Sequence, residues 1–102
     1  MSKATPEGKL KAECRAWLRA QGAYIFSPVA FGTTTTVDDL VCFKGAFIGI
    51  EYKRPDTRPK PTPRQEFIMG QIRAAGGEAI VVYELSHLKS VFYTLKETAN
   101  VL

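Results

Sequence analysis

The stretch of sequence that decides the fold is DLVCFKGAFIGIEYK, residues 39–53. It holds two runs of apolar and β-branched residues separated by residues 44–45 (KG), and two such runs around a two-residue turn predict a β-hairpin. The second run is apolar enough over residues 47–50 for a buried strand, yet it ends on the charged motif EYK, residues 51–53. Two charges at the exit of a buried strand are either a surface ion pair or part of a site.

The residues before the hairpin predict a helix, a short strand and a loop. Thr5 can cap the helix, and Pro6 suits its first position. Apolar residues recur at helical spacing until Gly22 ends the helix; they are Leu10, Cys14, Trp17 and Leu18. A strand over residues 23–26 follows, and residues 27–36, which include four consecutive threonines, predict a mobile loop.

The residues after the hairpin predict a second loop, two helices and a strand. The loop covers residues 54–61, whose three prolines exclude a central strand. Thr62 caps a helix that ends at residues 76–77, residues 78–83 form a buried strand, and Ser86 caps a last helix. The predicted order is α-β-β-β-α-β-α in a single domain over residues 1–102, of class α/β, or α+β if the mixed sheet is emphasised.

Composition limits the classes of protein to consider. With 102 residues there is room for one core, and the net charge of +4 with a pI of about 9.2 is compatible with a polyanionic partner. We expect no membrane span and no signal peptide, and therefore a cytoplasmic protein. Two cysteines, Cys14 and Cys42, are too few for a disulfide framework or a zinc site, and both are expected to be buried thiols.

The charged motif becomes informative together with Asp39, which opens the first strand of the hairpin. Counting back from the turn, residues near 39 oppose residues 50 or 51, so we expect the carboxylates of Asp39 and Glu51 to lie close together. Two neighbouring carboxylates repel, and a divalent cation between them relieves the repulsion. Hard oxygen ligands favour Mg²⁺ or Mn²⁺, and Lys53 adds positive charge where a phosphate would bind. The set predicts metal-assisted hydrolysis of a phosphodiester.

This arrangement resembles the PD-(D/E)xK nuclease superfamily and, more closely, its virus-type replication–repair nuclease (VRR-NUC) family. The matching residues are Glu7, Asp39, Glu51, Lys53 and Gln65. The resemblance implies a restriction-endonuclease-like core, in which helices flank a mixed sheet. It also implies catalytic roles for these five residues, with Asp39 and Glu51 as the metal ligands.

Three positions leave alternatives open. The family pattern places glycine and proline before its aspartate, whereas this chain reads TVDD at residues 36–39, so Asp38 competes with Asp39. We select Asp39 because it directly precedes the apolar run. Glu13 competes with Glu7 as the acid of the first helix. Gln65 lies three residues after Thr62, so a capping box also explains it.

The predicted function is a Mg²⁺- or Mn²⁺-dependent DNA endonuclease that selects structure rather than sequence and uses no small-molecule cofactor. Basic residues near the site are expected to contact phosphates or to form a solvated loop; they are Arg54, Arg58, Lys60 and Arg64. The resemblance implies branched DNA such as Holliday junctions, in phage or bacterial replication and repair. Two cuts in a junction require a homodimer, for which the outer face of the last helix (Val91, Phe92, Leu95) is a candidate interface. The alternatives are a non-catalytic nucleic-acid-binding domain and a nuclease subunit active only with a partner.

Overall fold

The structure is a computed structural model that describes residues 5–29 and 36–101, with side chains as far as residue 96. Its elements in chain order are α1 (Pro6–Ala20), β1 (Tyr24–Phe26), β2 (Asp39–Phe43), β3 (Ala46–Tyr52), α2 (Pro63–Ala74), β4 (Glu78–Val82) and α3 (Leu85–Val101). The predicted order α-β-β-β-α-β-α is confirmed. The threonine-rich part of the predicted mobile loop, residues 30–35, lies outside the described residues.

The hairpin organises a four-stranded mixed sheet in the order β1-β2-β3-β4. Lys44 and Gly45 have φ angles of 52° and 83°, and two consecutive positive φ angles give the turn whose twist suits a two-residue hairpin. The register runs from the pair Phe43–Ala46 at the turn to the pair Asp39–Ile50 at the other end. β1 pairs antiparallel with β2, and β4 returns parallel to β3 after the crossover through α2.

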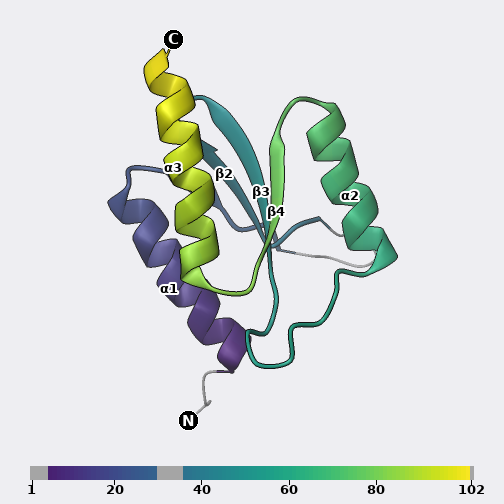
Figure 1. Ribbon diagram of the computed structural model, residues 1–102. Coiled ribbons are helices and arrows are strands. Elements are labelled where there is room, and N and C mark those ends of the chain that lie inside the picture. Colours follow the sequence, from purple (N-terminus) through teal and green to yellow (C-terminus); the bar gives the residue numbers. More distant parts are fainter. Residues whose placement is uncertain (1–4, 30–35, 102) are drawn as a thin grey trace.

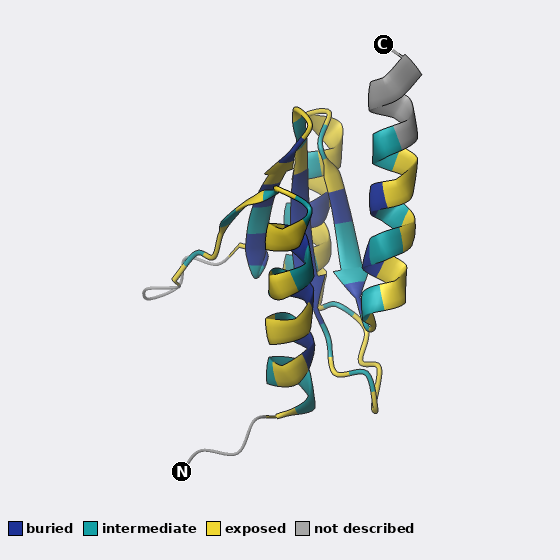
Figure 2. Cartoon of the chain, turned by 90° about the vertical axis from the view of Figure 1, so that its left-hand side faces the viewer, coloured by how far each residue is buried: buried dark blue, intermediate teal, exposed yellow. Residues whose placement is uncertain are grey.

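One face of the sheet carries the main hydrophobic core and is covered by α1 and α3, which lie together on that side (Figure 1). Alternate residues of a strand point to the same face, so every second residue of β2 and β3 enters this core. The buried side chains are Leu10, Cys14, Leu18, Val41, Phe43, Ile48, Ile50, Tyr52, Val82, Leu88 and Phe92. Figure 2 shows the corresponding buried stripe along α1 beneath an exposed outer surface.

The opposite face is covered by α2, which packs on β3 and β4 around a smaller core of Val37, Met69 and Ala79. Gly49 allows a close approach, because a Cβ placed there would lie 2.7 Å from the Cδ1 atom of Ile72. A side chain at position 49 would therefore require the side chains of Ile72 and Val37 to shift, so Gly49 contributes to the close packing of α2 on β3.

Two expectations for the last helix are corrected. α3 begins at Leu85, so Ser86 lies inside the helix rather than capping it. The face of α3 considered for dimerisation is part of the core: Phe92 is 1% exposed, and its ring lies 5.3 Å from that of Trp17 and 4.7 Å from that of Phe43. Edge-on and tilted ring pairs of this kind add to the burial energy, so this face already has its partners within the chain.

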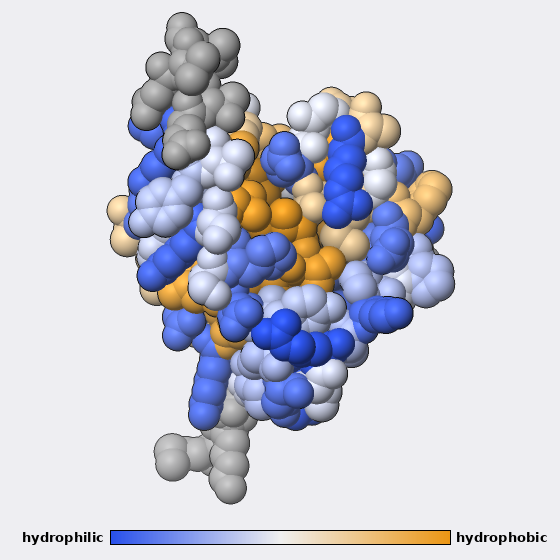
Figure 3. All heavy atoms as spheres, viewed as in Figure 1, coloured by the Kyte–Doolittle hydropathy of each residue, from blue (hydrophilic) through white to orange (hydrophobic). Residues whose placement is uncertain are grey.

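Apolar surface is visible in the band between α2 and α3, over the edge strand β4 (Figure 3). Ile80 and Val81 of β4 are both half-buried, Ile80 against the main core and Val81 against the smaller core under α2. None of the helices in the described part of the chain combines the length and the apolar character needed to cross a membrane.

The two cysteines differ in exposure, which corrects the expectation that both are buried. Cys14 is 0% exposed, and burial together with the negative charges of Glu13 and Asp39 raises the pKa of its thiol to about 12. Cys42 is exposed because it points to the α2 side of the sheet, at a part of β2 that α2 does not reach. We expect Ellman's reagent to react rapidly with Cys42 in the folded protein and with Cys14 only after denaturation. A Cys42→Ser variant that still reacts rapidly would contradict this assignment.

Candidate active site

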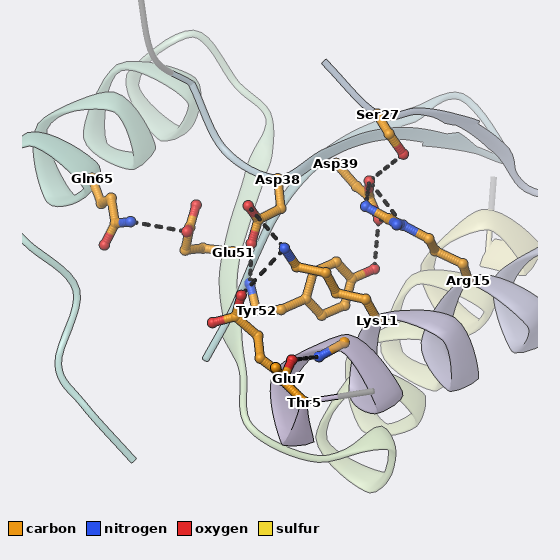
Figure 4. A network of polar contacts seen from close by, with 11 residues as sticks. Thr5, Glu7, Lys11, Arg15, Ser27, Asp38, Asp39, Glu51, Tyr52 and Gln65 are labelled. Atoms are coloured by element: carbon orange, nitrogen blue, oxygen red, sulfur yellow. Dashed lines mark hydrogen bonds and ion pairs between the residues drawn. The ribbon is translucent and has the colours of Figure 1, made fainter. Parts of the chain in front are cut away.

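Glu51 lies at the end of β3 on the α2 side of the sheet, and its side chain is buried. The Gln65 side-chain amide holds it: Gln65 Nε2 donates a hydrogen bond of 2.9 Å to Glu51 Oε1 (Figure 4). Gln65 Oε1 accepts a bond of 2.9 Å from the backbone N–H of Thr62, which completes a capping box. The capping box predicted for Gln65 is therefore confirmed, and its side-chain nitrogen also orients Glu51; a catalytic role for Gln65 stays a prediction.

Asp38, rather than Asp39, is the carboxylate that faces Glu51. Position 38 lies one step beyond the pair Asp39–Ile50, so it is opposite Glu51 and on the same side of the sheet. Asp38 Oδ2 accepts a hydrogen bond of 2.9 Å from the backbone N–H of Tyr52. This bond leaves Asp38 Oδ1 directed toward the space between Glu51 and α1 (Figure 4).

Glu51 is poised to accept a cation. Burial and the negative charge of Asp38 raise its pKa to about 7, and the nearby ammonium of Lys53 opposes this shift. Lys53 follows Glu51 by two positions, so it lies on the same side of the strand. Within the described part of the chain, Glu51 Oε2 is a buried oxygen without a hydrogen-bond donor. A buried acceptor without a donor is costly, and a bound cation would satisfy it.

Asp39 points to the opposite side of the sheet, which corrects the prediction that it lies beside Glu51. Its side chain is 0% exposed, and hydrogen bonds from three side chains surround the carboxylate. Arg15 binds it in a two-pronged ion pair with two bonds of 2.9 Å, Ser27 Oγ donates at 2.6 Å, and Tyr52 Oη donates at 2.7 Å. Burial opposes ionisation of Asp39, but these donors outweigh it and hold its pKa below the ordinary value. Asp39 is thus a core anchor between α1 and the sheet.

The wrong prediction for Asp39 comes from an approximate count of residue pairs from the hairpin turn. An exact count places Asp38, rather than Asp39, opposite Glu51. A two-residue turn at 44–45 pairs residue 43 with residue 46, and five further steps bring Asp38 opposite Glu51. The core pattern agrees, because Asp39 shares a face with Val41 and Phe43. Arg15 and Ser27 carried no such local signal, since each is far from Asp39 in sequence.

Glu7, the predicted acid of α1, is linked to the site through Lys11, which was not among the predicted site residues. Lys11 Nζ lies 3.3 Å from Glu7 Oε2 and 3.7 Å from Asp38 Oδ1 (Figure 4). The spacing of Glu7 and Lys11, one helical turn apart, was the available signal. Glu13, the alternative acid, instead lines a separate hollow with Leu10 and Tyr83.

The basic residues divide into two groups. Arg54 is paired with Asp56 at 2.7 Å, and Arg58 is paired with Glu84 at 3.1 Å. Arg58 also lies over the ring of Tyr83, whose hydroxyl donates 2.8 Å to the carbonyl of Pro59, so the loop is tied to the body of the protein. Lys60 is exposed, and Arg64 lines the hollow that contains Glu51. Of these four residues, Arg64 is the one that lines the same hollow as Glu51.

The hollow has a volume of about 400 Å³ and extends along the N-terminal end of α2. Its polar lining includes Asp38, Glu51, Arg64 and Gln65. In the part of the chain that the structure describes, no cluster of three or more His, Cys, Asp or Glu side chains is arranged to hold a metal. Two carboxylates still fit Mg²⁺ or Mn²⁺, because such ions commonly keep several waters and bind one or two carboxylates together with substrate phosphates. The donor-free oxygen of Glu51 favours the same conclusion.

A stability measurement tests the environment of Glu51. Because its pKa is about 7 in the folded protein and about 4.3 in an unfolded chain, the unfolded chain releases this proton first as the pH rises. Stability should therefore fall between these two pH values, by roughly 3–4 kcal/mol, and level off above pH 7. Glu51→Gln keeps the bond to Gln65 and removes the charge. We expect the variant to match the parent Tm near pH 4 and to exceed it by roughly 15–25 °C at pH 8. Equal Tm values at both pH values would contradict the assigned environment.

Comparison with known proteins agrees with this geometry at the level of the fold. No family model matches the sequence, and no curated protein matches it. A solved structure described as a VRR_NUC domain superposes with a TM-score of 0.76 at 24% sequence identity, over 88% of this chain and 97% of that chain. The chain therefore has the restriction-endonuclease-like fold of a VRR-NUC domain.

Proposed function

We propose that the protein is a divalent-metal-dependent endonuclease that hydrolyses phosphodiester bonds of DNA. The observation that carries the proposal is the buried, donor-free oxygen of Glu51 beside Asp38 and Lys53. A domain that only bound DNA would gain nothing from two carboxylates directed at phosphate, since like charges repel. The fold shared with a VRR-NUC domain supports the same function.

Asp38 and Glu51 are the residues that would hold Mg²⁺ or Mn²⁺. When bound, the cation supplies positive charge that polarises the scissile phosphate and eases the ionisation of water. Hydrolysis forms a bond between a water oxygen and phosphorus and breaks the bond from phosphorus to the leaving sugar oxygen. We assign the first of the two aspartates to this role because Asp39 is already saturated by donors in the core.

The remaining side chains position the reactants. Lys53 places an ammonium where it neutralises charge that develops on the phosphate oxygens. Gln65 fixes one oxygen of Glu51 and leaves the other for the cation. Lys11, itself paired with Glu7, adds a second positive charge next to Asp38. Arg64, at the rim of the hollow, is suited to an adjacent phosphate.

The proposed substrates are branched or flapped DNA, including four-way junctions, in the cytoplasm of a bacterium or phage-infected cell. The described surface offers little for reading base sequence, so the shape of the DNA would decide where it is cut. Paired cuts in a junction call for a homodimer. Sedimentation at micromolar concentration should then give twice the mass of one chain, and a monomer mass would contradict the paired-cut proposal.

The decisive experiment incubates the protein with supercoiled plasmid and with a synthetic four-way junction, in Mg²⁺, Mn²⁺ or EDTA. Glu51→Ala and Lys53→Ala are assayed in parallel, with far-UV circular dichroism to establish that both variants fold. Metal-dependent cutting that both substitutions abolish is the expected result. Tight binding to the junction without cutting in either metal would contradict the nuclease proposal and indicate a non-catalytic nucleic-acid-binding domain. Cutting that appears only after host extract is added would instead indicate a nuclease subunit that needs a partner protein.

A further inference from the structure

The α2 side of the sheet is only half covered, and the uncovered half is aromatic. α2 packs on β3 and β4, whereas β1 and β2 lie beyond it. A solvent-facing half of an antiparallel sheet normally carries polar side chains. Here it carries an aromatic face, which we define as Tyr24, Phe26, Leu40, Cys42 and Phe47. Its three rings are 69%, 54% and 47% exposed for Tyr24, Phe26 and Phe47, which makes this surface suited to binding a ligand.

The aromatic face is continuous with the candidate active site. The site hollow shares Thr36 and Ile68 with a second hollow of about 510 Å³ along α2. That hollow shares Leu40 and Phe47 with a third of about 310 Å³ on the aromatic face. The three hollows thus form one trough on the same side of the sheet as Asp38 and Glu51. An occupant of the aromatic face would reach the position of the scissile phosphate.

Charge along the trough favours a polyanion. None of the described residues that line the second and third hollows is charged, so no carboxylate there repels a phosphate. Arg64 lies at the site end, and Lys44 lies exposed at the hairpin tip beyond Cys42. Tyr24 and Phe26 are alternate residues of a strand, about 6.8 Å apart, which is twice the rise of ~3.4 Å between stacked bases.

The size of the aromatic face argues against a second protein copy as its occupant. At about 200 Å² for each aromatic side chain, the exposed parts of the three rings amount to roughly 350 Å². A stable protein interface needs about 800 Å² from each partner. Unpaired nucleobases need only ring surfaces on which to stack, beside positive charge for the backbone.

We propose that the aromatic face binds the unpaired bases of a single-stranded DNA segment that leads into the active site. This inference rests on the proposed nuclease function, because it names the substrate as DNA with a single-stranded arm next to the cut. Tyr24 and Phe26 are the main stacking residues, and Phe47 extends the platform toward α2. Duplex DNA, whose bases are already stacked, would not gain from this face.

The test measures fluorescence anisotropy of a labelled oligothymidylate, and of an abasic oligonucleotide of equal length, in EDTA so that nothing is cut. Tyr24→Ala and Phe26→Ala should each weaken oligothymidylate binding about tenfold, because each loses one stacking partner. Phe26→Tyr keeps a ring and should bind within twofold of the parent. Phe67→Ala, whose ring is 59% exposed on α2 outside the trough, should also leave binding unchanged. The abasic strand should bind weakly to the parent and lose nothing further in the alanine variants.

Equal affinity of the parent for the intact and abasic strands would overturn the inference. So would a native dimer that becomes monomeric in Phe26→Ala, since the aromatic face would then be a contact between copies. Melting curves of the exposed-residue variants separate loss of binding from loss of fold. Plasmid cleavage is measured separately: cutting without base-dependent binding rejects only this inference, and base-dependent binding without cutting rejects only the nuclease.

Discussion

Asp38→Asn should lower the rate of DNA cleavage by about a thousandfold while leaving the protein folded. Asp38 lies close enough to Glu51 for its charge to raise the pKa of Glu51, and replacing one of these two carboxylates removes half of the proposed cation site. A bound divalent cation contributes several kcal/mol to a transition state, and each 1.36 kcal/mol is tenfold in rate. The substitution is nearly isosteric and keeps an oxygen for the N–H of Tyr52. Single-turnover cleavage at saturating Mg²⁺ measures the rate.

Two controls sharpen this result. Mn²⁺ affinity, measured by calorimetry without DNA, should fall in Asp38→Asn, which separates a cation ligand from a residue that only shapes the site. Glu13→Gln removes an acid of α1 that lines a different hollow and should cut at the parent rate. Cleavage by Asp38→Asn within tenfold of the parent would reject the assignment of Asp38.

Asp39→Asn should destabilise the fold by about 3 kcal/mol, because it leaves the Arg15 guanidinium without its counter-charge. In a domain of this size that corresponds to a fall in Tm on the order of 10–20 °C. The destabilisation caused by Asp39→Asn should become smaller at acid pH. Donors hold the pKa of Asp39 below its ordinary value, so its contribution is present above about pH 4 and disappears as the pH falls through the folded-state pKa. Calorimetry between pH 3 and 8 tests both statements.

A matched control uses the Arg54–Asp56 pair, which has the same two-pronged geometry on the surface. Asp56→Asn should leave the Tm unchanged, since solvent screens an exposed pair. If Asp39→Asn melts like the parent but loses Mn²⁺ binding, then Asp39 is a cation ligand and our assignment of the two aspartates is reversed.

The neighbouring positions 38 and 39 show where sequence reasoning succeeds and where it ends. Local signals predicted the hairpin, the helix starts at Thr5 and Thr62, and the element order. They also placed Glu51 and Lys53 at the exit of a buried strand. Each of these depends on residues within a few positions of one another.

The remaining features depend on tertiary contacts. The hairpin register fixes which aspartate faces the core, but the donors that satisfy Asp39 there are distant in sequence: Arg15 is 24 residues away and Ser27 is 12 residues away. The exposure of Cys42 depends on how far α2 extends across the sheet, and the burial of Phe92 depends on Trp17 and Phe43. The periodicity of apolar residues in the sequence identifies the apolar face of a single helix or strand. It does not show whether another element of the fold packs against that face.

Tyr52 recognises both aspartates at once, its backbone N–H bonding Asp38 and its hydroxyl bonding Asp39. A strand that slips by one residue exchanges its two faces. Because both faces of β2 carry apolar residues, burial of apolar side chains alone does not prevent such a slip. In a slipped hairpin, Tyr52 would lose both bonds and Arg15 would lose its carboxylate. These two hydrogen bonds from one tyrosine therefore favour the native register over a compact hairpin shifted by one residue, in which the proposed active site would not form.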